Sequence, residues 1–259
     1  MIKLEHVVLA SPEQMEFIIE GMRNPMNSWG KSDSYAGCRI TEDDNVTGNH
    51  PVGEPQKCET CAWCEPLCYG EPERRSHILG PNDHSLIQRL ANAGTDHRKF
   101  MRMMPVYVRI TAPLYWWKEF DTYKVGTVAN SCSTMHKIQE KEFTLEDFSC
   151  EHLMTKEAFA FPLGGGWRGL DTLEVLKCTI EALNNARKRY LATKDKKYWW
   201  QMIQLLPSSY NQTRNVMMNY EVLANIYKSR KDHKLDEWRE FCKWIEELPY
   251  SELIIGKED

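Results

Sequence analysis

The segment Ala112–Met135, which reads APLYWWKEFDTYKVGTVANSCSTM, constrains the fold of this chain most. Pro113 and the aromatic run after it predict a packed helix, and the preceding residues Pro105–Thr111 (PVYVRIT) alternate as a strand does. After the helix, small and hydroxylated residues dominate between Gly126 and Thr134. A rigid strand and helix that lead into a polar loop often present chemistry to a ligand. A core helix followed by an ordinary Ser/Thr-rich turn is the alternative interpretation.

Cys132 is the strongest nucleophile of this polar loop. Lys118 and Lys124 are cations close to it in sequence, and such neighbours activate a thiol. Nucleophilic catalysis by Cys132 is therefore one hypothesis for the segment. A Cys132→Ser variant that turns over as fast as the wild type would exclude a covalent role.

Periodic patterns predict further elements along the chain. Ile2–Leu9 alternates as a strand, and the capping box Ser11-Pro12-Glu13-Gln14 starts a helix after it. A second capping box, Asp171-Thr172-Leu173-Glu174, starts a helix that runs to about Thr193. The other predicted helices are Asn82–Ala93, Tyr198–Leu206, Asn211–Arg230 and Leu235–Leu248. We expect these elements to form a single domain over residues 1–259.

Two groups of polar residues within these elements are candidates for ligand binding. The turn GTDHRKF carries His97, Arg98 and Lys99, a basic group suited to a phosphate or carboxylate, or else an ordinary solvated turn. Asn219 and Arg230 lie eleven residues apart, which places them nearly on one face of the helix predicted over Asn211–Arg230. That alignment indicates either a buried hydrogen-bonded network or a contact with a ligand.

The stretch from about Gly37 to Pro81 is rich in Gly, Pro, Asn and Glu and is interpreted as an insertion. Four cysteines within it, in the run CETCAWCEPLC, have the spacing of metal ligands: Cys58, Cys61, Cys64 and Cys68. Zinc and an iron–sulfur cluster both use such a run, and a structural zinc staple is slightly favoured. Clustered free thiols on a loop are the alternative.

Charge and cysteine usage limit the class of protein. The net charge of −4 and the absence of a strongly basic region argue against binding to nucleic acid or to a membrane surface. No run of residues is apolar and long enough to span a membrane, and the N-terminus does not have the pattern of a signal peptide. The nine cysteines are then expected to be reduced thiols or metal ligands in a cytoplasmic protein.

The order of features from Gly94 to Met135 resembles the flavin-dependent thymidylate synthases, in which a His-containing turn is followed by an apolar strand, a Pro and an aromatic helix. Without gaps, His97, the strand Val106–Ile110 and Pro113 take the family's positions. A second block matches further along the chain, at Leu205–Pro207, Asn219, Leu223, Asn225, Arg230 and, after a one-residue gap, Glu237–Phe241.

The chain departs from the family pattern where the family binds anions. The Arg-His-Arg motif that grips the flavin phosphates stands here as Thr122-Tyr123-Lys124, and a lysine does not replace the bidentate fork of an arginine. The serine beneath the pyrimidine ring is Cys132, and the helical glutamine on the nucleotide is Glu119. The other changes are Ala129-Asn130 for Asn-Glu, Thr134 for a phosphate-binding Arg, and Ile203 for an Arg.

The resemblance implies an α/β fold with a curved, mainly antiparallel sheet flanked by long helices, assembled as a homotetramer. It implies transfer of a one-carbon unit from methylenetetrahydrofolate to dUMP or a related pyrimidine deoxynucleotide, with FAD as cofactor and NADPH as reductant. The residues it assigns to catalysis are Cys132, Arg230 and Glu119, and those it assigns to the cofactor are His97, Tyr123, Lys124, Asn219 and Asn225. Glu119 suggests a shifted substrate with a ring amino group, as in cytosine. A non-catalytic descendant that binds a nucleotide or a protein is the alternative.

Overall fold

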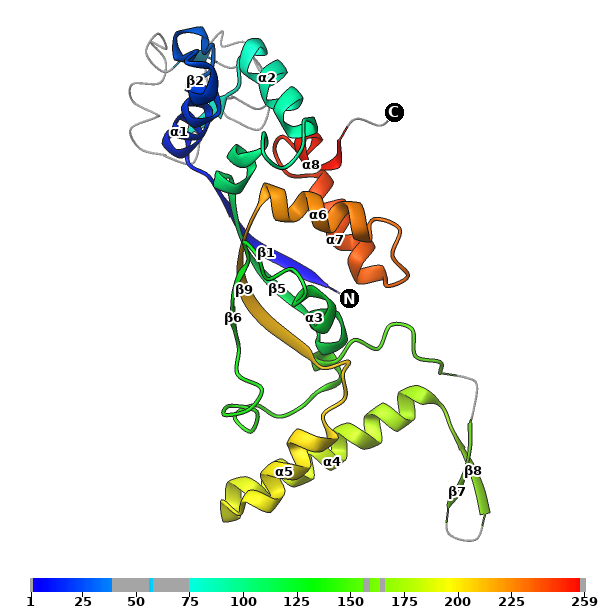
Figure 1. The fold of residues 1–259 in the computed structure, drawn as a ribbon. Coiled ribbons are helices and arrows are strands. Elements are labelled where there is room, and N and C mark those ends of the chain that lie inside the picture. The colour runs from blue at the N-terminus through cyan, green and yellow to red at the C-terminus, as the bar shows by residue number, and fades with distance from the viewer. Residues whose placement is uncertain (1, 39–55, 58–74, 156–158, 164–165, 257–259) are drawn as a thin grey trace, which may run out of the picture.

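An open, four-stranded antiparallel sheet with the order β1-β5-β9-β6 forms the centre of the molecule (Figure 1). The structure is a computed structural model, and it describes residues 2–38, 56–57, 75–155, 159–163 and 166–256. The central strands are β1 (Lys3–Leu9), β5 (Pro105–Pro113), β9 (Asn211–Asn219) and β6 (Val128–Ser131). The α/β class and the antiparallel sheet flanked by helices are confirmed.

The alternation predicted for β5 explains how the sheet buries one face. Val106, Val108 and Ile110 are buried, whereas Tyr107 and Arg109 between them are exposed. Successive side chains of a strand point to opposite faces, so β5 presents an apolar row to one side. The neighbouring strand β9 aligns its own buried residues with this row, because Val216 pairs with Val108 and Met218 with Val106.

Six of the described helices form one hydrophobic core with the apolar face of the sheet. These helices are α1 (Pro12–Arg23), α2 (Pro81–Asn92), α3 (Leu114–Phe120), α6 (Tyr220–Arg230), α7 (Asp236–Glu246) and α8 (Glu252–Ile255). At the centre of the core, the rings of Trp116 and Trp238 lie 4.7 Å apart between centroids, with Trp117 and Phe241 packed against Trp116. Full burial of an aromatic ring contributes about 2–3 kcal/mol, so this group anchors α3 to α7.

A second, smaller core lies around a helical hairpin at the end of the molecule away from α1 and α2 (Figure 1). The hairpin consists of α4 (Thr172–Thr193) and α5 (Lys196–Leu205), and Leu183 and Met202 are its fully buried residues. The capping box predicted for α4 is confirmed, because the Asp171 side chain accepts a hydrogen bond from the Glu174 amide. A β-hairpin, β7 (Phe159–Leu163) and β8 (Gly166–Leu170), precedes α4.

Two parts of the secondary structure differ from the prediction. The first half of the helix predicted over Asn211–Arg230 is the strand β9, and α6 begins only at Tyr220. Pairing along the whole of β5 outweighs the helical spacing of apolar residues, and the Asn219 side chain then caps α6 by accepting a hydrogen bond from the Val222 amide. The polar loop predicted after α3 contains a short edge strand, β6, whose residues are all exposed.

The described ends of the predicted insertion form a small antiparallel sheet. Its strands are β2 (Tyr35–Cys38), β3 (Gln56–Lys57) and β4 (Arg75–Ile78), and β2 pairs with both of the others. Cys58, Cys61, Cys64 and Cys68 lie outside the described residues, so metal binding there stays a prediction.

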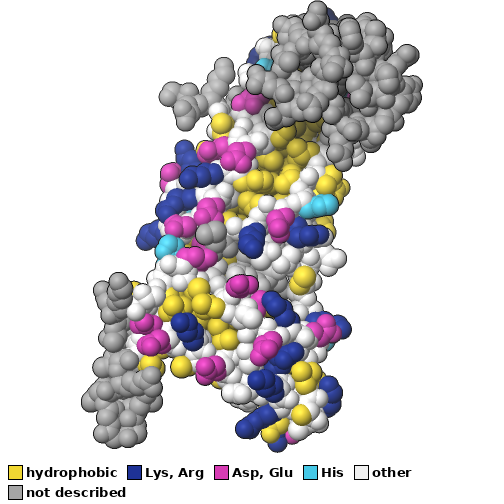
Figure 2. Space-filling model, turned by 180° about the vertical axis from the view of Figure 1, so that it is seen from behind, with side chains coloured by type: hydrophobic (Ala, Val, Ile, Leu, Met, Phe, Trp, Pro, Cys, Tyr) yellow, Lys and Arg dark blue, Asp and Glu magenta, His cyan; other side chains and the backbone are white. Residues whose placement is uncertain are grey.

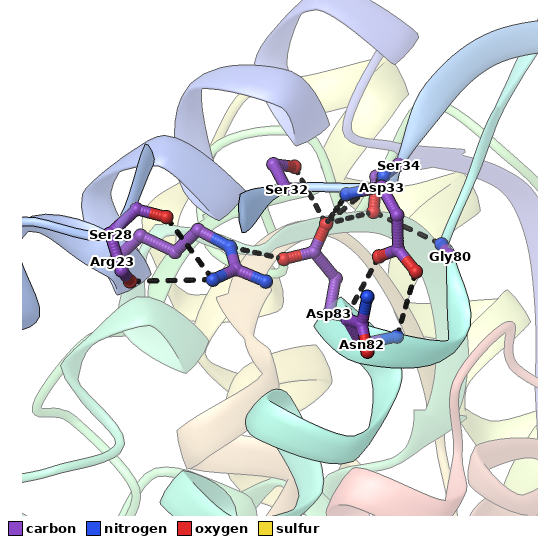
Figure 3. A network of polar contacts seen from close by, with 8 residues as sticks. All are labelled: Arg23, Ser28, Ser32, Asp33, Ser34, Gly80, Asn82 and Asp83. Carbon is purple, nitrogen blue, oxygen red and sulfur yellow. Dashed lines mark hydrogen bonds and ion pairs between the residues drawn. The ribbon is translucent and has the colours of Figure 1, made fainter. Parts of the chain in front are cut away.

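A buried carboxylate ties this part of the chain to α1 and α2 (Figure 3). Asp83 has no exposed surface, and its Oδ1 accepts a hydrogen bond from Arg23 Nε at 2.6 Å. Its Oδ2 accepts hydrogen bonds from the hydroxyls of Ser32 and Ser34 and from the backbone amides of Asp33 and Ser34. With both oxygens satisfied, the carboxylate fixes the start of α2 to the loop before β2.

The surface carries charges of both signs side by side. On the face in Figure 2, Lys and Arg side chains are interspersed with Asp and Glu over most of the area that is not grey. No helix within the described residues has the length and apolar character needed to cross a membrane.

Candidate functional site

An ion pair between α3 and α6 brings together two residues that are far apart in the sequence. Arg230, the last residue of α6, donates a hydrogen bond from Nη1 to Glu119 Oε2 at 2.6 Å. Its Nε donates to the hydroxyl of Tyr123 at 2.9 Å. Three residues predicted for the site, Glu119, Tyr123 and Arg230, therefore meet at one place.

Trp238 and His233 complete this cluster from the segment that follows α6. The indole of Trp238, at the start of α7, donates from Nε1 to Glu119 Oε2 at 3.0 Å. His233 Nε2 lies 3.4 Å from the same oxygen. The guanidinium carbon of Arg230 lies 4.8 Å from the centre of the Trp238 ring, within the range of a cation–π contact. We call Glu119, Tyr123, Arg230, His233 and Trp238 the Glu119–Arg230 cluster.

One hydrogen bond to the His233 ring indicates its tautomer. The backbone amide of Leu235 donates to His233 Nδ1 at 3.2 Å, so this nitrogen carries the lone pair. In the neutral ring, the proton is then on Nε2, which faces the Glu119 carboxylate. Every contact made to Glu119 Oε2 within the described residues comes from a donor, as an ionised carboxylate requires.

The Glu119–Arg230 cluster is accessible from solvent. The side chain of Glu119 is 35% exposed and that of Arg230 is 18% exposed, whereas Trp238 beneath them is fully buried. A charged donor and a charged acceptor are thus held side by side on a rigid aromatic base. Such a pair suits a polar planar ring that has both a donor and an acceptor on one edge.

The turn after Tyr123 lies against the start of α6. Gly126 has a φ of +80°, and a Cβ at this position would lie 2.9 Å from Asn219 Nδ2. Only glycine fits this combination of a left-handed backbone and a close approach. Beside it, the hydroxyl of Thr127 is buried and has no hydrogen-bond partner among the described residues. The segment from Tyr123 to Thr127 therefore contacts both ends of α6: Gly126 lies against Asn219 at its start, and Tyr123 accepts a hydrogen bond from Arg230 at its end.

The basic turn before β5 is held by a carboxylate of α6. Glu221 is buried, and it forms ion pairs with Arg102 at 2.6 Å and with Arg98 at 3.5 Å. The prediction treated these arginines as an open basic group and missed their shared partner. His97 and Lys124 are both exposed, and their role in cofactor binding stays a prediction.

Cys132 lies elsewhere on the same chain, at the end of β6. It is exposed, and its backbone amide donates to the Thr213 carbonyl of β9. It lines a polar cavity of about 260 Å³ together with Lys141, Asp147 and Tyr210, to which no residue of the Glu119–Arg230 cluster contributes. Within one chain, the predicted nucleophile and the predicted arginine therefore line different places.

The role of Asn225 in cofactor binding and the metal site at the Cys-rich run both stay predictions. Asn225 is exposed on α6, and ideal helical spacing places it about 140° around the axis from Arg230. Among the described residues, no group of three or more His, Cys, Asp or Glu side chains could hold a metal ion.

Sequence reasoning missed His233 as a member of the cluster and assigned Trp238 only to packing. A signal for Trp238 was available, because a buried indole N–H needs an acceptor and Glu119 is the acidic residue of the aromatic helix. Nothing comparable marks His233, which lies in the short connection between α6 and α7.

Comparison with known proteins identifies the fold. No model of a protein family matches the sequence, and no curated protein sequence matches it either. The structure is similar to that of the flavin-dependent thymidylate synthase of Helicobacter pylori in complex with FAD and dUMP, at 16% identity over 98% of this chain and 97% of that one, with a TM-score of 0.56. A second structure of that enzyme with the same ligands gives a TM-score of 0.55 over 98% of this chain and 96% of that one, again at 16% identity.

A UMP/dUMP methylase of Streptomyces cacaoi, solved with 5-bromo-dUMP, matches 95% of this chain and 88% of its own at 12% identity, with a TM-score of 0.47. The match to the Helicobacter enzyme spans nearly the whole of both chains, and it agrees with the order of sequence features from His97 to Phe241. The chain has the fold of the flavin-dependent thymidylate synthases.

Proposed function

We propose that this protein is a flavin-dependent, thymidylate-synthase-like methyltransferase that acts on a pyrimidine deoxynucleotide, dUMP or a related nucleotide. The observation that carries the proposal is the Glu119–Arg230 cluster. Three positions that match the family's site by sequence converge there, although they come from α3, from the turn after α3 and from α6.

The chemistry that the cluster offers fits a pyrimidine ring. Arg230 is held by Tyr123 and lies over Trp238, so its guanidinium is fixed before a ligand binds. It would stabilise negative charge that develops on a ring oxygen when the ring carbon becomes nucleophilic. Glu119 would accept a hydrogen bond from a ring N–H or from a ring amino group.

The residues fit the ring part of FAD better than its phosphates. The family's flavin motif stands at Tyr123 and Lys124, whose side chain is exposed, and in the same turn the buried hydroxyl of Thr127 has no hydrogen-bond partner among the described residues. Lys124 is the cation that this motif retains, and Arg98 and Arg102 are already paired with Glu221. When bound, reduced FAD would carry the one-carbon unit to the substrate. His97, Tyr123, Lys124, Asn219 and Asn225 are the residues proposed to hold it.

The proposed overall reaction balances with folate and NADPH as co-substrates. Methylenetetrahydrofolate supplies the carbon and NADPH supplies a hydride, so the new methyl group replaces the hydrogen on the ring carbon. That hydrogen leaves as a proton, the two folate nitrogens that held the carbon take up two protons, one of them from solvent, and tetrahydrofolate and NADP⁺ are released. A proton lost from the ring gives a direct assay.

We also propose that the active sites form between subunits of a homotetramer. Cys132 and the Glu119–Arg230 cluster line different places within one chain, so Cys132 would act on a ring held by a neighbouring subunit. The open face of the sheet supports such contacts, because Val8 of β1 and Tyr107 of β5 are each nearly half exposed and are paired in the sheet. Light scattering coupled to size exclusion tests this assembly.

A non-catalytic nucleotide- or protein-binding module is the second candidate. Two observations favour it. Glu119 already accepts a hydrogen bond from the Arg230 guanidinium, and the arginines with which the family binds phosphate are absent from the matching positions. A module of this kind would bind a nucleotide without releasing a proton from its ring.

The test is a titration of the purified protein with FAD, followed by absorbance, and then an assay of tritium release from [5-³H]dUMP and [5-³H]dCMP. Saturable FAD binding together with tritium release that requires folate and NADPH supports the enzyme. FAD binding without release from either nucleotide, or no FAD binding at all, contradicts it. Nucleotide binding by calorimetry under those conditions would favour the binding module.

A further inference from the structure

A small apolar cavity lies at the junction of β1 and α1, and none of its lining residues belongs to the Glu119–Arg230 cluster. Its volume is about 220 Å³. Its walls come from five separate segments, including Ala10 and Met15 after β1, Met104 before β5, and Tyr220 at the start of α6. None of the residues that line it is an Asp, Glu, Lys or Arg. A well-formed apolar cavity with few polar groups is the common form of a small-molecule site.

Among the described residues that line this cavity, His77 is the one with unpaired polar side-chain atoms, and it also lines a neighbouring polar cavity beside Glu16, Glu20 and Arg23. Its side chain is buried, with 7% of the residue exposed, and neither ring nitrogen has a hydrogen-bond partner among the described residues. Burial lowers the pKa of His77 and outweighs the nearby charges of Glu16 and Asp83. The neutral ring then has one N–H donor and one lone-pair acceptor, and leaving them unpaired in a buried place is costly.

The wall opposite His77 is held in a strained conformation. Tyr250 lines the cavity with a φ of +58°, in the left-handed region that a tyrosine rarely adopts. Its hydroxyl donates to the His77 carbonyl at 2.8 Å, and the Tyr220 hydroxyl donates to the Pro249 carbonyl. Both tyrosines are thereby fixed, so their rings form a rigid wall. Strain of this kind collects at ligand-binding places.

From this cavity we infer a second binding site, for an uncharged molecule with a single aromatic ring and one hydroxyl group, that is, a phenol. The size fits, because a cavity of about 150 Å³ is enough for benzene. Two tyrosine rings and the sulfur atoms of Met15 and Met104 favour an aromatic partner. A charged ligand would be buried without a counter-charge, so the ligand is neutral.

The hydroxyl follows from the tautomers of His77. Whichever nitrogen of the neutral ring reaches the ligand, it offers either a donor or an acceptor. A hydroxyl is the smallest group that can pair with either a donor or an acceptor nitrogen, since it donates one hydrogen bond and accepts others. The ligand's hydrogen bond would satisfy a buried nitrogen of His77 that has no partner among the described residues.

The experiment compares p-cresol with toluene, which has the same ring and methyl group but no hydroxyl. Binding to the purified full-length protein is followed by saturation-transfer NMR titration. We expect p-cresol to bind saturably with a Kd on the order of 1 mM and toluene to bind about threefold to tenfold more weakly. No saturable binding of p-cresol up to about 10 mM would overturn the inference.

Variants locate the binding. His77→Phe keeps a flat ring but removes the nitrogens, so it should bind p-cresol and toluene equally. Ala10→Phe fills the cavity and should abolish binding of both, whereas Ala192→Phe, which adds the same bulk to an exposed position of α4, should leave both unchanged. Far-UV circular dichroism checks that each variant is folded.

Binding that survives Ala10→Phe in a folded protein, or an equal preference for p-cresol in His77→Phe and the wild type, would contradict the assignment to this cavity. Because the titration uses neither flavin nor nucleotide, its outcome is independent of the proposed enzymatic function. His77→Phe should also raise the melting temperature of the unliganded protein, since it removes a buried polar group that has no partner among the described residues.

Discussion

Two ion pairs of this molecule, Arg23–Asp83 and Arg230–Glu119, have the same short distance of 2.6 Å and opposite surroundings. Asp83 has no exposed surface, and both of its oxygens accept hydrogen bonds (Figure 3). Glu119 is about one-third exposed, and the contacts described for it converge on Oε2. In the first pair both carboxylate oxygens have hydrogen-bond partners inside the protein, whereas the second pair leaves donors and acceptors at the surface.

The difference separates a structural ion pair from one that is available to a ligand. A buried carboxylate with all its hydrogen bonds made has nothing left to offer, and removing one partner leaves the other charge uncompensated. A partly exposed pair contributes little to stability, because water competes for both charges. The first should therefore act on folding and the second on activity, and substitutions in each test this division.

The largest expected effect is on stability, in the variant Asp83→Asn. The change keeps the shape of the side chain but leaves the Arg23 guanidinium buried without its counter-charge. We expect the free energy of unfolding to fall by about 3–5 kcal/mol, measured by urea denaturation. The control is Asp195→Asn, at the exposed N-cap of α5, where asparagine caps as well as aspartate and the change should be below about 0.5 kcal/mol. Equal losses in both variants would show that the Asp83 network is not a structural anchor.

The second effect is on activity, in Arg230→Lys. A lysine keeps the charge but cannot donate to Glu119 and Tyr123 together, so the group that stabilises ring charge is no longer fixed. Under the proposed function, kcat for tritium release from the better nucleotide should fall by about 10²-fold, with a stability loss of no more than about 1 kcal/mol.

Arg239→Lys is the matched control, because Arg239 is half exposed and pairs with Asp236 within the first turn of α7. It should leave both turnover and stability unchanged. If Arg230→Lys destabilised the protein as strongly as Asp83→Asn and left kcat intact, the Glu119–Arg230 pair would be structural too.

The region around the Arg23–Asp83 pair could be predicted only in part from the sequence, because the two charged residues lie far apart along the chain. Local signals were sufficient for the capping boxes at Ser11 and Asp171 and for the alternation of β5, and all three are confirmed. Asp83 is 60 residues from Arg23, with the insertion between them, and no local pattern marks such a pair.

The residues of the Glu119–Arg230 pair were predicted in a different way, from the family resemblance. Glu119, Tyr123 and Arg230 were named because their positions match a family, and the structure brings their side chains together, although β9 and not a helix leads to α6. Pairing with β5 decides the conformation of Asn211–Asn219, and such long-range pairing cannot be read from the spacing of apolar residues alone. Glu221 was missed as the partner of Arg98 and Arg102 for the same reason.

A third prediction tests the turn that links the two ends of α6. Gly126→Ala places a Cβ 2.9 Å from Asn219 Nδ2 and 3.0 Å from Val222 Cγ2, at a φ of +80°. Strain and the displaced cap of α6 should together lower stability by about 1–3 kcal/mol. Gly30→Ala, where a Cβ would meet nothing within 4 Å, is the control and should change stability by less than about 0.5 kcal/mol.

Under the proposed function, Gly126→Ala should also weaken FAD binding, because the turn from Tyr123 to Thr127 would shift. Unchanged FAD affinity in a destabilised but folded variant would remove this turn from the cofactor site while leaving its structural role intact.

The smallest expected effect is a dependence of stability on pH that comes from Asp83. Burial alone would raise its pKa, but hydrogen bonds from Ser34, Ser32 and Arg23 and the charge of Arg23 outweigh burial and lower the pKa below the ordinary value of 3.8. The opposition of the two influences makes the net effect modest. The unfolded chain therefore binds a proton at a higher pH than the folded chain does, and the stability from the ionised form is fully present above pH about 4.

That stability is lost as the pH falls from about 4 through the lowered pKa of the folded state. Asp83→Asn has no proton to gain, so the difference in unfolding free energy between wild type and variant should be constant from neutral pH down to about 4 and shrink below it. Urea denaturation at a series of pH values measures this difference. A difference that stays constant down to the lowest pH at which both proteins fold would mean that the charge of Asp83 contributes nothing beyond its shape.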